Sequence, residues 1–177
     1  MTNQPHPPST ATQGPASPSP VRVQWWRMPF SADTWRRTSY VLLASLLSLV
    51  AVPVALLGGY RMVARWQRGL AHRFLGLRVD RPPTALRVAA HALLSLPLNL
   101  ASLALVAYLW LLVVANLAYP LRPGTMDSYQ HSWGGPTLAG AWAVHAAFGL
   151  GVLLVIPWVV RAATWLQGRL VLRLLGH

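Results

Sequence analysis

Two histidines, His91 and His145, are the residues whose type and setting most suggest chemistry, because each lies within a long apolar run. An ionisable side chain inside a membrane-crossing segment is a functional candidate by default, and two facing imidazoles could ligate haem. Their depths differ, however. His91 lies 27 residues before Ala118, about 40 Å along a helix, whereas His145 lies about 12 Å inside its own helix. We therefore expect each to be a hydrogen-bonded or interfacial histidine, and a bis-histidine redox protein is kept as a third interpretation.

Carboxylates and hydroxyls offer no catalytic arrangement. The three acids, Asp33, Asp80 and Asp127, are far apart in the sequence, whereas acid–base or hydrolase chemistry needs carboxylates or a Ser–His pair within mutual reach. The chain has no cysteine, which excludes thiolate chemistry and cysteine metal sites. We expect no catalytic residue, no metal site and no cofactor, and we interpret Asn99 and Asn116 as groups that hydrogen-bond between helices.

A cluster of polar and aromatic side chains lies in residues 125–136, TMDSYQHSWGGP. Alternate side chains of an extended segment face the same way. That spacing would place Asp127, Tyr129, His131 and Trp133 together against a ligand. The alternative is a solvated loop with one tryptophan at the membrane interface.

The elements that must position these groups are strongly apolar. Hydrophobic residues make up 54% of the chain and charged residues 10%, whereas soluble domains carry roughly 25% charged residues. The formal net charge of +12 comes from fifteen basic residues, all arginine, against three aspartates. Because these arginines flank apolar runs, we expect them to meet anionic lipid headgroups, and no nucleic-acid partner is predicted.

Three charge-free stretches, residues 38–60, 88–121 and 128–160, predict membrane helices, since a span needs roughly 20 apolar residues. Pro97 is expected to kink the second stretch, so that residues 98–118 cross and the part before them lies at the interface. The third helix is expected over residues 137–160. The loop between the second and third helices, residues 119–136, carries little charge and is expected outside the cell.

The first stretch has arginines on both sides, with Arg36 and Arg37 before it and Arg61 and Arg65 after it. Both flanks therefore favour the cytoplasm, and one crossing cannot satisfy both. Either the stretch is a re-entrant hairpin bent near Pro53 and Gly58-Gly59, or one basic flank is forced outside.

Two basic amphipathic segments, residues 61–76 and 161–176, match each other at an offset of one hundred residues. In the first segment, apolar side chains recur every four residues, as in an interfacial helix. The match predicts an internal repeat. The arginines expected to contact lipid headgroups are Arg61, Arg65, Arg68, Arg161, Arg169 and Arg173.

Residues 1–28 are rich in proline, serine and threonine, which predicts a disordered tail ahead of a single membrane domain over residues 29–177. The predicted fold class is all-α, with multi-pass membrane helices and two amphipathic interfacial helices in an internal repeat. The predicted location is the cell membrane.

Three segments resemble the membrane sensor domain found at the N-terminus of many actinobacterial histidine kinases. They are PFSADTWRRTSYVLL at residues 29–43, LPLNLASLALVAYLWLLVVANLAYPL at 96–121 and PWVVRAATWLQGRLVLRLLG at 157–176. The family usually has a longer first apolar region and continues into kinase parts, so kinase activity is not expected of this sequence. The resemblance implies a non-enzymatic sensor-like module in a two-component system. Its partner would be a histidine kinase, another signalling protein or a second copy of the chain. The alternative is an accessory subunit of a transporter or channel.

Overall fold

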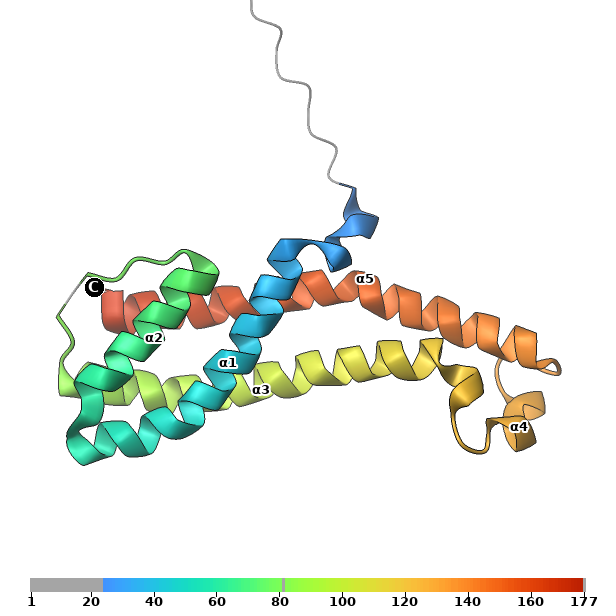
Figure 1. Ribbon diagram of the computed structural model, residues 1–177, viewed down its shortest axis with the longest axis horizontal. Coiled ribbons are helices and arrows are strands. Elements are labelled where there is room, and N and C mark those ends of the chain that lie inside the picture. Colours follow the sequence, from blue (N-terminus) through green and yellow to red (C-terminus); the bar gives the residue numbers. More distant parts are fainter. Residues whose placement is uncertain (1–23, 81, 177) are drawn as a thin grey trace, which may run out of the picture.

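The computed structural model describes residues 24–80 and 82–176, and these residues form helices and connecting loops with no β-strand among them. The long helices are α1 (Ala32–Val54), α2 (Tyr60–Leu75), α3 (Ala85–Leu117) and α5 (Leu138–Val171), and α4 (Thr125–Ser128) is a single turn. Helices α3 and α5 lie antiparallel along the longest axis, and α1 and α2 pack across one half of that pair (Figure 1). The all-α prediction is confirmed.

Within residues 24–80 and 82–176, three helical stretches are long and apolar enough to cross a membrane, namely Ala32–Leu75, Ala85–Leu117 and Leu138–Gly176. A helix satisfies its backbone hydrogen bonds internally, which a hydrocarbon environment requires. Two ends of the molecule are distinguished below. The loop end holds the connection between α3 and α5, and the basic end holds α2, the start of α3 and the C-terminal turns (Figure 1).

The first apolar stretch is not itself the predicted hairpin, because its residues up to Val54 lie in the single helix α1, which continues through Pro53. The chain reverses at the end of the stretch, and the hairpin pairs α1 with α2. After α1 the chain passes through a wide helical turn, Ala55–Gly59, where Gly58 has φ 90°, a conformation that only glycine adopts readily. Tyr40 near the start of α1 then lies beside Phe74 near the end of α2, with ring centroids 6.5 Å apart. Leu56 and Leu57 at the tip are 71% and 87% exposed.

Helix α3 differs from its prediction, because it continues through Pro97 as one rod from Ala85 to Leu117 (Figure 1). Proline removes one backbone donor but does not end a helix whose two sides are held by packing. Residues 85–97 are packed against α1, α2 and the C-terminal turns. Residues 85–97 therefore belong to the same helix as residues 98–117 and do not form a separate element.

The separate amphipathic helix predicted at residues 161–176 is also wrong, because α5 runs without a break from Leu138 to Val171 and continues into a wide turn over Leu172–Gly176. The cause lies in the residues that precede the two repeat segments. Gly58-Gly59 allows the chain to reverse before α2, whereas the equivalent positions in α5 are Trp158 and Val159. Only the first segment therefore has a glycine hinge.

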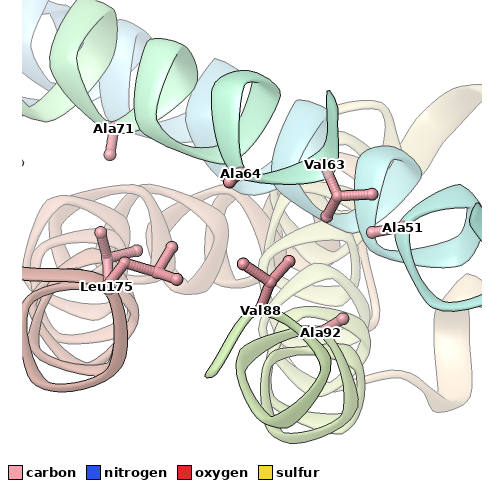
Figure 2. Close-up of a cluster of buried hydrophobic side chains, with 8 residues drawn as sticks. Ala51, Val63, Ala64, Ala71, Val88, Ala92 and Leu175 are labelled. Carbon is pink, nitrogen blue, oxygen red and sulfur yellow. The ribbon is translucent and has the colours of Figure 1, made fainter. Parts of the chain in front are cut away.

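Two buried apolar clusters hold the helices together. One lies at the basic end and joins α1, α2, α3 and α5 mostly through small side chains (Figure 2). The other lies between α1, α3 and α5 around Val41, Val106 and Ile156. Small residues allow the helices to approach closely. In lipid, this close van der Waals packing holds helices together, because the hydrophobic effect does not act between them there.

The last residues of the predicted tail contain a short helical turn. Residues 1–23, most of the predicted tail, lie outside the described residues, but Trp25–Phe30 form a 3-10 turn. The Thr34 hydroxyl donates a 2.7 Å hydrogen bond to the Met28 carbonyl, which ties this turn to α1.

Candidate functional site

The connection at the loop end is a compact set of helical turns. Tyr119–Leu121, Thr125–Ser128 and Tyr129–His131 each form a short turn, and Gly124 and Gly134 adopt φ of 76° and 91° where the chain changes direction. The extended arrangement expected for residues 127–133 is therefore wrong. Alternate side chains of a helical turn do not share a face.

A hollow of about 480 Å³, here called the outer pocket, lies between this loop and the adjoining ends of α3 and α5. It is lined by Asn116, Ser132, Trp133, Val144, His145 and Phe148. Of the four predicted ligand residues, Trp133 lines the pocket, and it is 84% exposed at the rim. Asp127, Tyr129 and His131 are not among the lining residues, so the structure does not bring the predicted set together.

His145 is the central polar group of the outer pocket, and the sequence argument did not select it as a ligand residue. Its ring stacks on Tyr119 with centroids 3.9 Å apart, and its Nδ1 lies 2.8 Å from the Ala141 carbonyl oxygen. A carbonyl only accepts, so Nδ1 is the donor of this hydrogen bond. The Tyr119 hydroxyl lies 2.7 Å from the Ser132 hydroxyl, which fixes the loop over this ring pair.

The chemistry of the outer pocket suits a small amphipathic ligand. Trp133, Val144 and Phe148 supply apolar walls, and Asn116 and His145 supply polar groups, the composition typical of small-molecule sites. Asn116 itself donates to the Leu112 carbonyl of its own helix at 2.7 Å. Its predicted bond between helices is therefore wrong.

A second polar site, here called the polar junction, is buried where α1, α3 and α5 meet. Asn99 donates to the Ala44 carbonyl at 3.1 Å and accepts a 2.9 Å hydrogen bond from the Gln167 amide. The Ser45 hydroxyl donates to the Asn99 carbonyl at 2.9 Å. The predicted role of Asn99 between helices is confirmed, and this one residue connects three helices.

Beside the polar junction is a cavity of about 20 Å³ lined by Tyr40, Ser48, Gln67, His91, Ser95 and Gln167, among others, with room for about one water molecule. His91 is 4% exposed, and neither of its ring nitrogens has a hydrogen-bond partner among the described residues. The side-chain oxygens of Gln67 and Gln167 are also unpaired. Because an unpaired buried polar group costs about 1–3 kcal/mol, this cavity is suited to a bound water.

A charged cluster fastens the start of α1 to the middle of α5. Asp33 forms ion pairs with Arg36, Arg37 and Arg161 at 3.0–3.1 Å, and Arg37 also donates to the Thr164 hydroxyl at 2.9 Å. A carboxylate shared by three guanidinium groups leaves a net positive cluster. The start of α1 and α5 are thereby held together by charge as well as by packing.

The arginines predicted to contact headgroups differ in their surroundings. Arg61, Arg65 and Arg173 are exposed, and Arg169 is exposed with its guanidinium 4.2 Å from the Trp165 ring centroid. Arg68 donates to the Leu175 carbonyl at 3.4 Å. Arg161 is half-buried against Asp33, so its guanidinium is already engaged within the chain.

A comparison of the chain with known protein families, with curated proteins and with solved structures finds no match. The resemblance to the kinase sensor domain therefore rests on the three sequence segments alone. The outer pocket and the polar junction are both built on α3 and α5, so these two helices connect the two sites.

Proposed function

We propose that this chain is a non-enzymatic, multi-pass sensor-like module of the cell membrane. In this proposal, a ligand in the outer pocket or a change in the bilayer alters the packing of α3 against α5, and the α1–α2 hairpin moves in response. The observation that carries the proposal is that α3 and α5 line the outer pocket at the loop end and, farther along, contact α1 of the hairpin at the polar junction, near the middle of α3.

Close packing of α3 and α5 supports this coupling. A Cβ built on Gly149 would lie 3.1 Å from the Asn116 Cβ, and the Trp142 indole donates to the Leu117 carbonyl at 2.9 Å. Packed helices shift between discrete arrangements more readily than they deform continuously. A change of spacing at the outer pocket would therefore reach the bond between Asn99 and Gln167.

The output of such a module passes to another protein. The sequence resemblance favours a histidine kinase or another signalling protein of a two-component system, and a second copy of the chain is also compatible. The hairpin presents exposed arginines, including Arg61 and Arg65, on the side where the charge pattern places the cytoplasm.

A steric wedge tests the proposed coupling. Gly149→Val would push α3 from α5 beside the outer pocket, and Gly151→Val is the matched control because a Cβ there meets nothing within 4 Å. The reporter is Ala71→Cys, a fully buried position on α2 in this cysteine-free chain. We expect the wedge, and not the control, to change the rate at which a maleimide labels this cysteine. Equal rates in folded wedge and control proteins would reject the coupling.

The alternative, an accessory subunit of a transporter or channel, has one observation in its favour. The cavity at His91 places polar groups inside a bundle that could span a membrane, as substrate pathways do. Its volume of about 20 Å³ is nevertheless too small for a substrate larger than water. Co-purification with a permease would favour this alternative over the sensor.

A further inference from the structure

The outward side of the α1–α2 hairpin carries a groove of about 680 Å³, here called the hairpin groove. Leu43 and Leu47 of α1 and Leu70 and Phe74 of α2 form its apolar surface, and Arg65 and Arg73 of α2 are basic members of the lining. The volume lies within the range of about 300–1,000 Å³ typical of ligand pockets. The groove is a separate feature from the outer pocket and from the cavity at His91.

The charges of the hairpin groove point to an anionic ligand. Arg65 and Arg73 are both exposed, and their eight-residue separation places them about 12 Å apart along α2, near the same face. Neither forms an ion pair within the part of the chain that the structure describes. None of the described lining residues is acidic, so no carboxylate competes with a bound anion there.

The apolar part of the hairpin groove points to a ligand with a hydrocarbon chain. It adjoins the outward face of α1, where Leu42, Leu46 and Leu49 are exposed, as expected of a surface that contacts lipid. A free inorganic anion would leave the leucines and Phe74 uncovered. An amphipathic anion would cover them and neutralise the two arginines at the same time.

We propose that the hairpin groove binds one anionic phospholipid. The phosphate is held by Arg65 and Arg73, whose planar guanidinium groups match phosphate oxygens in pairs, and an acyl chain lies against Leu47, Leu70 and Phe74. This inference rests on the proposed membrane location but not on signalling, so it can fail while the coupling of α3, α5 and the hairpin holds.

Gly69 provides a direct way to block the hairpin groove. It lines the groove, and a Cβ built on it meets nothing within 4 Å. Gly69→Leu would therefore place a side chain in the groove from an unhindered Cβ and with better helix propensity than glycine. Gly151→Leu is the matched control, since Gly151 is equally open but lies on α5, away from the groove.

The experiment is native mass spectrometry of the full chain in detergent with phosphatidylglycerol or phosphatidylcholine. We expect one retained phosphatidylglycerol per chain, with a preference of about thirty-fold. That figure corresponds to about 1 kcal/mol for each arginine, converted at 1.4 kcal/mol per factor of ten. Arg65→Gln with Arg73→Gln should abolish the preference. Gly69→Leu should abolish retention, and Gly151→Leu should retain lipid as the wild type does.

Two further measurements separate this site from its alternatives. Arg78→Gln with Arg122→Gln removes the same charge from two exposed arginines outside the groove, neither of which is among the arginines predicted to contact headgroups, and it should leave lipid retention unchanged. Excess inorganic phosphate should not displace the lipid. Retention in Gly69→Leu, equal loss in the Arg78 and Arg122 variant, or displacement by inorganic phosphate would each overturn the proposal.

Discussion

Gln67 and Gln167 lie one hundred residues apart in the sequence, yet both line the same buried cavity. They are 7% and 3% exposed, and each occupies the same position of the predicted repeat. Gln167 also donates to Asn99 at 2.9 Å. The two repeat segments thus differ in their connection to the preceding helix but present the same amide group to one site.

The Asn99–Gln167 bond can be tested by a double-mutant cycle. Asn99→Leu should lower the free energy of unfolding by about 1–2 kcal/mol, because hydrogen bonds between helices in membranes are worth about 0.6–2 kcal/mol. The additional change Gln167→Leu should cost less in the Asn99→Leu background than in the wild type, since its partner is already gone. Unfolding in detergent with sodium dodecyl sulfate measures all four proteins. Strict additivity would contradict a direct bond.

Asp33→Asn tests the charged cluster that joins α1 to α5. The aspartate side chain is part-exposed, so each ion pair contributes at most about 1 kcal/mol. We expect loosening of the first turn of α1, measured as faster thiol labelling of Thr34→Cys, a buried position. Salt should reduce the difference, because it screens exposed charges. Asp127→Asn, an exposed acid at the loop end, is the control and should not alter labelling.

Alanine substitutions at Gly58 and Gly69 test whether the turn at the hairpin tip requires the backbone conformation of glycine. Gly58 has φ 90° and Gly69 lies inside α2, and a Cβ on either meets nothing within 4 Å. Gly58→Ala should therefore destabilise the chain by about 1–2 kcal/mol through backbone strain alone. Gly69→Ala should stabilise it by about 0.5–1 kcal/mol. Thermal unfolding in detergent measures both, and a stabilised Gly58→Ala protein would show that the turn is not required.

Membrane orientation is tested with single cysteines. Ser128→Cys at the loop end should react with a membrane-impermeant maleimide in intact cells. Arg173→Cys at the basic end should react only after permeabilisation. Both positions are exposed in the structure, so burial does not confuse the result. The reverse pattern would show that the arginines do not set the orientation.

The sequence predicted the helices well and their junctions less well. Long charge-free runs located α1, α3 and α5. In an apolar environment the backbone N–H and C=O groups must bond to each other, and a helix achieves this within one segment. Gly58-Gly59 located the reversal because glycine permits positive φ. Helix α3 continues through Pro97, and α5 continues past Arg161. Both helices are packed against α1 and α2, and the spacing of apolar residues in the sequence does not reveal such contacts between helices.

The sites were harder to predict because they combine distant positions. Trp133 was identified from its loop, but His145 and Asn116 join it only when α3 and α5 pack together. His91 was recognised as unusual within an apolar run, whereas its neighbours Gln67 and Gln167 sat inside segments interpreted as interfacial. Their burial follows from the hairpin at Gly58, which turns the Gln67 face of α2 toward α3 and α5.

The cavity at His91 leads to the last prediction. A bound water would pair with His91, Gln67 and Gln167, whose side chains each carry unpaired buried atoms. His91→Phe fills the space and expels the water, so the two glutamine oxygens stay buried without a partner at a cost of about 1–3 kcal/mol each. Adding Gln67→Met removes one of these oxygens with little change in volume. The double variant should therefore be more stable than His91→Phe alone, as measured by unfolding in detergent. If Gln67→Met destabilises the His91→Phe protein as much as the wild type, the two side chains do not share a water.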